Sequence, residues 1–119
     1  MPRKILFVVK SSPYGSLMAA EGFRIATALI AMDVLPHLLF IDDGVYCLLK
    51  NQRPEAAGLE SYYERLKTLA DLVGLYAVRD SVAKRDLKAI DFDESFNVKL
   101  LAIDKAAKLI MENETVIAF

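Results

Sequence analysis

The sequence predicts an α/β domain with three layers, in which helices cover both faces of a five-stranded, mostly parallel sheet. Short apolar runs without polar alternation, the first at residues 4–10, are typical of parallel strands that are covered on both faces. These runs alternate along the chain with segments of helical periodicity, which implies right-handed crossovers between parallel strands. No repeat or linker interrupts the pattern. We therefore expect residues 1–119 to form a single domain with a flavodoxin-like sheet.

Proline, glycine and serine residues indicate a turn and then a helix after the first strand. Pro13 and Gly15 punctuate a turn over residues 11–15. We expect Ser16 to cap the next helix, which runs to about Met32, because its hydroxyl can accept a backbone N–H at the helix start. Apolar residues cover two sides of this helix. One side is therefore expected to pack on the sheet and the other on a neighbouring subunit.

The remaining elements follow from apolar periodicity and from glycine and proline signals. Residues 35–41 predict the second strand, and one or two helical turns follow Gly44 before a loop at 51–55. The clearest helix spans 59–73, and Gly74 is expected to end it in the left-handed conformation. The rest of the chain predicts a strand at 75–78, a short helix at 81–88 and then a loop, a strand at 98–101, a helix at 103–111 and a terminal strand at 115–119.

Composition limits the classes of function. The chain has 15 basic and 16 acidic residues and a formal net charge of -1, which argues against direct nucleic-acid binding. No apolar run approaches the roughly 20 residues that cross a bilayer, so no membrane association is expected. A single cysteine cannot form an internal disulfide, which favours the reducing cytoplasm. The hydrophobic content of 55% is high, and some apolar surface is expected to face another subunit.

Several common active sites cannot be assembled from these residues. Gly15 stands alone, so neither a phosphate loop nor a dinucleotide-binding fingerprint is present. One histidine and one cysteine cannot build a His/Cys metal site, and we expect neither a metal nor another cofactor. A Ser–His–Asp triad would need His37, which lies within a predicted strand beside a proline. We interpret that histidine as a packing or surface residue.

Two strand ends carry the candidate functional residues, because function in parallel α/β sheets collects where a strand meets the next helix. The turn at residues 11–16 offers hydroxyls and a glycine that could bind a small ligand or a nucleotide. The segment 41–52 closes a strand with two acids and a glycine, and then enters a helix that carries the only cysteine. These two segments are therefore the first places to look for a site.

Each reactive side chain in these segments also has a structural interpretation. Asp42 and Asp43 could act as a base or bind a cation, but we favour a role for one of them in capping the next helix. Cys47 lies near a helix start, where the local dipole could stabilise a nucleophilic thiolate. We favour its interpretation as a small buried hydrophobe. Glu21 and Arg24 are expected to form a solvated or interfacial pair.

Four segments carry a family resemblance: Ser12-Pro13-Tyr14-Gly15 followed by Glu21-Gly22, the block Phe40-Ile41-Asp42-Asp43-Gly44-Val45-Tyr46-Cys47-Leu48-Leu49-Lys50-Asn51-Gln52-Arg53-Pro54, residues 67–76, and Thr115-Val116-Ile117-Ala118-Phe119. Together they resemble the DsrE/DsrF/TusC family, and most closely its TusC/DsrF branch. The resemblance covers nearly the whole chain and is weakest at 79–97. The block at 40–54 is its most specific part.

The resemblance implies a flavodoxin-like fold and a multimeric sulfur carrier. In this family three related subunits assemble into a heterohexamer, and the DsrE/TusD-type subunit carries a persulfide on a cysteine toward tRNA thiolation or sulfur oxidation. The chemistry is thiol exchange, in which a thiolate attacks a persulfide and takes its outer sulfur. The family places that cysteine after the third strand, near Val78 of this chain. Neither Val78 nor the next three residues is a cysteine.

The resemblance therefore favours an accessory, non-catalytic subunit of a cytoplasmic sulfur-relay complex, with DsrE/TusD-type and DsrH/TusB-type homologues as partners. We expect the first helix and the 42–52 segment to form the interface. The binding or interface candidates are Ser12, Pro13, Tyr14, Gly15, Glu21, Asp42, Asp43, Gly44, Tyr46 and Gln52. One alternative is a stand-alone, homo-oligomeric thiol or persulfide transferase that uses Cys47. Another is a ligand-binding module that uses the turn at 11–16.

Overall fold

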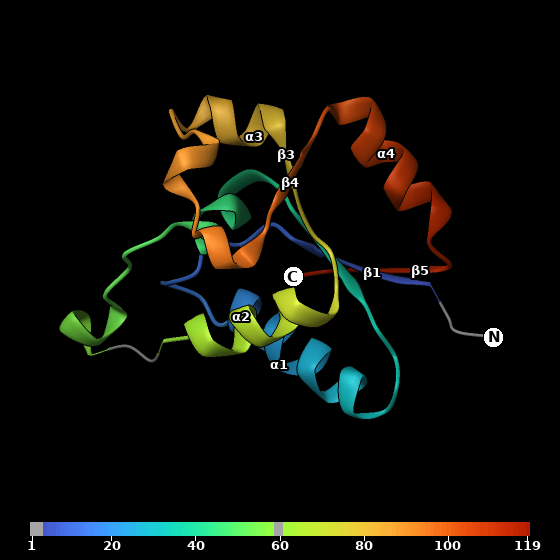
Figure 1. Cartoon of the computed structure of the whole chain (residues 1–119), viewed down its shortest axis with the longest axis horizontal. Helices are drawn as coiled ribbons and strands as arrows, with labels where there is room; N and C mark the ends of the chain where they lie inside the picture. The colour runs from blue at the N-terminus through green and yellow to red at the C-terminus, as the bar shows by residue number, and fades with distance from the viewer. Residues whose placement is uncertain (1–3, 59–60) are drawn as a thin grey trace.

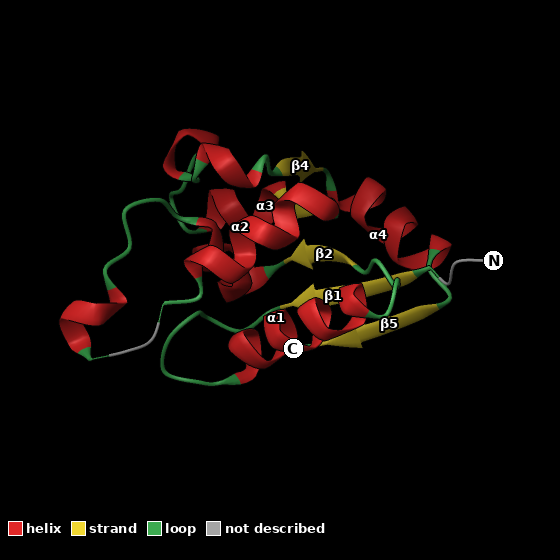
Figure 2. Ribbon diagram, turned by 60° about the horizontal axis from the view of Figure 1, so that its bottom comes forward, coloured by secondary structure: helices red, strands yellow, loops and turns green. Residues whose placement is uncertain are grey.

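The computed structural model describes residues 4–58 and 61–119. Its five strands are β1 (Ile5–Val9), β2 (His37–Phe40), β3 (Leu75–Val78), β4 (Lys99–Leu101) and β5 (Thr115–Ala118). They form one sheet in the order β4-β3-β2-β1-β5, and all neighbouring strands are parallel. Figure 2 shows β5 beside β1 at one edge of this sheet. The predicted five-stranded parallel sheet is confirmed.

The strand order follows from the crossovers. From β1 to β4 each strand lies beside its predecessor, and the chain then returns to place β5 on the free side of β1. Flavodoxin itself has the order 2-1-3-4-5. The likeness to flavodoxin therefore holds for the layers and the parallel sheet but not for the order of the strands.

The helices are α1 (Met18–Ala31), α2 (Tyr63–Leu72), α3 (Arg79–Lys84) and α4 (Ile103–Glu112), with short 3₁₀ helices η1 (Asp42–Leu48), η2 (Pro54–Ala57), η3 (Ala89–Asp91) and η4 (Glu94–Phe96) in the described ranges. Helices α1 and α2 lie on one side of the sheet and α4 lies on the other (Figure 1). No helix among the described residues is long and apolar enough to cross a bilayer.

The three central strands β1, β2 and β3 are buried on both faces, which explains why they show no polar alternation, whereas the edge strands β4 and β5 are more exposed. On β1, Phe7 and Val9 belong to the large core beneath α1 and α2, which also contains Phe23 and Leu66. The alternate residues of the same strand join a smaller core beneath α4, around Ala106. The two clusters confirm the predicted three-layer arrangement.

The predicted helix starts and ends are partly correct. The hydroxyl of Ser16 accepts the N–H of Met18 at 3.1 Å, as expected of a residue at the helix start, although Leu17 occupies the N-cap position. The helix predicted at 59–73 is α2, which begins at Tyr63; residues 59–60 of that prediction lie outside the described residues. The helix predicted at 81–88 is the earlier and shorter α3.

The predicted left-handed conformation of Gly74 is wrong. In the described chain, the glycines with positive φ are Gly15 and Gly58. A Cβ at Gly74 would lie 2.8 Å from the ring of Tyr76, and its backbone N–H donates to Nδ1 of His37 at 2.8 Å. Close packing and a hydrogen bond, rather than backbone conformation, therefore explain this glycine.

Gly44 allows η1 to pack against the carboxyl end of β1. A Cβ at this position would overlap the carbonyl oxygen of Val9 and lie 2.7 Å from its carbonyl carbon. The same carbonyl accepts the N–H of Ile41 at 3.0 Å. The backbone of η1 thus approaches β1 more closely than any residue with a side chain permits.

We expect Gly44→Ala to lower the free energy of unfolding by more than about 3 kcal/mol, because the β1 backbone would have to move. Gly15→Ala is the matched control. Gly15 has a φ of 92° and nothing lies within 4 Å of an added Cβ, so only left-handed strain of about 1–2 kcal/mol is expected. Urea unfolding followed by circular dichroism measures both. Equal losses in the two variants would contradict the close-packing argument.

Candidate functional site

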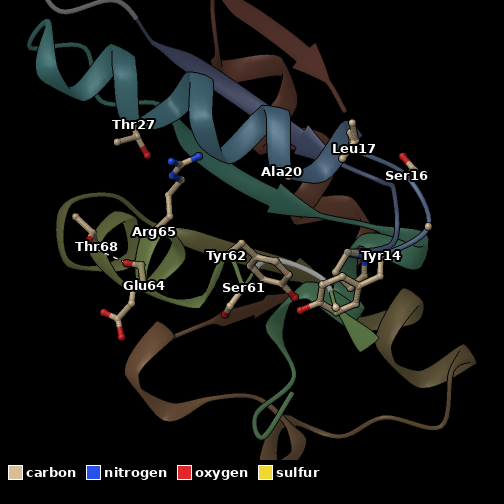
Figure 3. A pocket seen from close by; sticks show the side chains of 13 residues that line it. Tyr14, Ser16, Leu17, Ala20, Thr27, Ser61, Tyr62, Glu64, Arg65 and Thr68 are labelled. Carbon is tan, nitrogen blue, oxygen red and sulfur yellow. Dashed lines mark hydrogen bonds between the residues drawn. The ribbon is translucent and has the colours of Figure 1, made fainter. Parts of the chain in front are cut away.

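A cavity of about 890 Å³ opens between α1 and α2, beside the turn that follows β1 (Figure 3). Residues 13–17 form one wall, and Ala20 and Thr27 of α1 form another. The opposite wall comes from Ser61 and from the first turns of α2. The cavity therefore includes Pro13, Tyr14 and Gly15, three of the residues that the sequence indicated.

Two tyrosines form the floor between this cavity and a smaller one. The rings of Tyr14 and Tyr62 lie 5.6 Å apart at 39°, and their hydroxyls point toward one another (Figure 3). Beyond them is a second cavity of about 300 Å³, lined in part by Tyr14, Cys47, Gln52 and Tyr62. The structure thus brings together residues from both candidate segments of the sequence.

Hydrogen bonds fix Tyr62 and Gln52 against the end of η1. The Tyr62 hydroxyl lies 3.1 Å from the carbonyl oxygen of Cys47, to which it donates, and 3.2 Å from Oε1 of Gln52. Nε2 of Gln52 donates to the carbonyl oxygens of Tyr46 and Leu49, at 3.1 and 2.9 Å. Burial raises the pKa of the Tyr62 phenol, so it stays protonated and acts as a donor. Tyr62 was missed as a functional residue because its spacing indicated only a helix face.

The charged residues near the cavity come from α1 and α2. The guanidinium of Arg24 donates to the Glu21 carboxylate, with the shortest contact at 2.7 Å, and both side chains are exposed. This pair is the one expected from the sequence. The hydrogen bond from Arg24 lowers the pKa of Glu21, with a smaller contribution from Arg65 of α2. Arg65 points across the cavity toward α1, whereas Glu64 points away from it (Figure 3).

Asp42 and Asp43 do not cap η1, and the capping prediction is wrong. The N-cap residue is Ile41, and no side chain caps this helix. Asp42 has a φ of 48°, and its N–H donates to Oγ of Ser81 at 3.0 Å. The Asp43 carboxylate instead accepts two hydrogen bonds from Arg85, at 3.1 and 3.0 Å. Because Arg85 lies 42 residues away, the sequence held no signal for this pair.

These contacts tie η1 to the place where the family resemblance locates a carrier cysteine. Val78 ends β3 immediately before α3, and its side chain is buried in the core beneath α4. Arg79 and Asp80 are exposed. Ser81 is buried, and its hydroxyl oxygen accepts a hydrogen bond from the backbone N–H of Asp42. An aliphatic side chain therefore occupies the expected carrier position.

Cys47 is fully buried, with an exposed fraction of 0%. Its Sγ lies 3.9 Å from the carbonyl oxygen of Ser11, to which the thiol can donate. Burial raises the pKa of the thiol to about 12. At neutral pH the group is therefore a protonated thiol packed in the core, as in the favoured interpretation of the sequence.

His37 has a structural role at the amino end of the central strand β2. Its Nδ1 accepts the Gly74 N–H, and its ring lies edge-on to Tyr76 at 6.1 Å. Burial lowers the pKa of the imidazole. Among residues 4–58 and 61–119, no group of three His, Cys, Asp or Glu side chains could hold a metal ion.

Comparisons with known proteins find relatives over the whole chain. A model of the DsrE/DsrF-like family matches residues 3–119. The chain is 30% identical over 131 aligned positions to the intracellular sulfur oxidation protein DsrF of Allochromatium vinosum, covering 98% of this chain and 96% of that protein. The crystal structure of the ychN protein from E. coli has a TM-score of 0.79 at 22% identity and covers 98% of this chain and 99% of its own. MTH1491 of Methanobacterium thermoautotrophicum, a protein of unknown function, has a TM-score of 0.74 at 13% identity, with full coverage of both chains.

We expect the partial burial of His37, which lowers the pKa of its imidazole, to make stability depend on pH. The usual imidazole pKa of 6.5 is lowered in the folded protein, so the unfolded chain binds the proton first as pH falls. The free energy of unfolding is then highest above about pH 6.5 and decreases as pH falls toward the lower folded pKa. His37→Gln keeps an acceptor but does not titrate, and it should reduce this dependence. Urea unfolding between about pH 5.5 and 7.5 measures it; identical slopes for both proteins would contradict the argument.

Proposed function

The chain belongs to the DsrE/DsrF-like family, and from this premise we propose that it is an accessory subunit of a cytoplasmic sulfur-relay complex. In this proposal the chain holds no persulfide, and a DsrE/TusD-type partner carries the sulfur. The observation that carries the proposal is the buried Val78 at the expected position of the carrier cysteine. A relative named for intracellular sulfur oxidation favours that setting over tRNA thiolation.

The chemistry of sulfur transfer supports this division of roles. An attacking thiolate bonds to the outer sulfur of a persulfide, the sulfur–sulfur bond breaks, and the donor's thiolate leaves. The aliphatic Val78 cannot attack in this way. With a pKa of about 12, only on the order of one Cys47 thiol in 10⁵ is ionised at neutral pH, and that thiol has no exposed surface. These properties also disfavour the alternative transferase that would use Cys47.

Exposed apolar side chains offer surfaces for partner subunits. Near the end of α4 and on β5 they include Met111, Val116 and Ile117, with exposed fractions of 84%, 42% and 41%. Within residues 4–58 and 61–119, strand β5 is an edge strand that pairs with β1 alone, and its sequence holds neither lysine nor proline to block further pairing. At the start of α1, Leu17 and Met18 are also exposed. We therefore assign the predicted interface of α1 to its first turn, and we add the edge formed by α4 and β5.

The test is native mass spectrometry of the protein recovered from its own cells, followed by the intact mass of every subunit. We expect a mixed assembly with DsrE/TusD-type and DsrH/TusB-type homologues, and additional sulfur only on the partner. Reductant removes that sulfur and is the control for its persulfide nature. An assembly of this chain alone, or additional sulfur on this chain, would contradict the proposal.

A further inference from the structure

We propose that the cavity between α1 and α2 binds a small aromatic anion, meaning a planar ring that carries a carboxylate, sulfonate or phosphate. The inference is independent of the sulfur-relay role, because no residue of this cavity takes part in the sulfur chemistry argued above. The volume of about 890 Å³ falls within the range of about 300–1,000 Å³ that is typical of small-molecule sites. Its chemistry rests on three features: rings, free hydroxyl donors and a guanidinium.

The rings of Tyr14 and Tyr62 supply a flat apolar surface. They lie 5.6 Å apart and tilted, and Tyr62 also packs on Phe23 at 5.4 Å, which holds it in place. Pro13 and Ala20 extend the apolar wall. An aromatic ligand placed here would gain stacking contacts and cover apolar surface that is now open to solvent.

The hydroxyl groups of the lining provide hydrogen-bond donors. Ser16 and Ser61 each accept a backbone N–H at the start of a helix, at 3.1 and 3.2 Å, so their own hydrogens remain available. The Tyr14 hydroxyl points toward the Tyr62 hydroxyl at the floor of the cavity (Figure 3). Burial raises the pKa of Tyr14, which keeps it a donor. These donors favour a ligand rich in acceptor oxygens.

The guanidinium of Arg65 gives the cavity its charge. This side chain extends across the cavity toward α1, while the neighbouring Glu64 carboxylate points away (Figure 3). The nearby Glu21 carboxylate is already held by Arg24 at 2.7 Å. Among the described residues that line the cavity, Arg65 is the one cation and Glu64 is the one carboxylate, with its side chain turned away. A guanidinium binds carboxylate, sulfonate and phosphate oxygens through paired N–H groups, which selects an anion over a neutral ligand.

The experiment is an NMR titration of the ¹⁵N-labelled full chain with 1-naphthalenesulfonate and, separately, with the neutral 1-naphthalenemethanol. We expect saturable shifts of the amides at 14–17 and 61–68, and affinity at least about tenfold higher for the sulfonate. Arg65→Gln should weaken sulfonate binding about tenfold and leave the neutral compound unaffected. Lys67→Gln is the matched control, because Lys67 is an exposed cation on α2 outside the cavity.

The dispersion of the variant spectra reports whether each variant is folded. A salt titration of the unmodified chain gives a second test, because raising the salt concentration should weaken binding of the sulfonate more than binding of the neutral compound. Shifts centred elsewhere, equal affinity for the two compounds, or an affinity unchanged by Arg65→Gln would each overturn the proposal. The measurement uses this chain alone, so its outcome does not depend on the sulfur-relay assembly.

Discussion

The close packing of η1 against the carboxyl end of β1 is the contact on which the functional end of this molecule depends. It requires glycine at position 44, because a side chain would overlap the Val9 carbonyl. Phe119 also binds the segment that follows β1: its carbonyl oxygen accepts the N–H groups of Lys10 and Ser11, both at 3.3 Å. With the 3₁₀ segment held in this way, Cys47 points into the core, where its thiol stays protonated.

The same segment organises the residues on both sides of it. On one side, its carbonyl groups anchor Tyr62 and Gln52, and the Tyr62 ring then separates the two cavities. On the other side, Asp43 binds Arg85 and the Asp42 backbone binds Ser81, which ties α3 to the end of β2. One short helix thus positions both the cavity between α1 and α2 and the place where the family resemblance locates a carrier cysteine. Val78 occupies the place where the family resemblance predicts a thiol.

The three layers of the fold could be predicted from the sequence, but the contacts between segments that are distant in the sequence could not. Unbroken apolar runs predicted parallel strands because both faces of the central strands are buried, and the two cores on either side of β1 bear this out. The prediction for Gly74 was wrong because a glycine after a helix commonly adopts a left-handed conformation. Here the absence of a side chain makes room for the ring of Tyr76. The pairing of Asp43 with Arg85, and the meeting of Tyr14 with Tyr62, join segments that no local pattern connects. Side-chain roles at the site depend on such contacts.

We propose that this chain takes part in sulfur relay without carrying sulfur itself. The most direct measurement exposes the native protein to a persulfide donor, then to an alkylating reagent, and records the intact mass of this chain before and after unfolding. The account predicts that the native chain gains neither sulfur nor label, and that the unfolded chain is labelled once, at Cys47, with Cys47→Ala as the blank. Sulfur or label on Cys47 of the native chain would show that the thiol is open to exchange and would contradict the account.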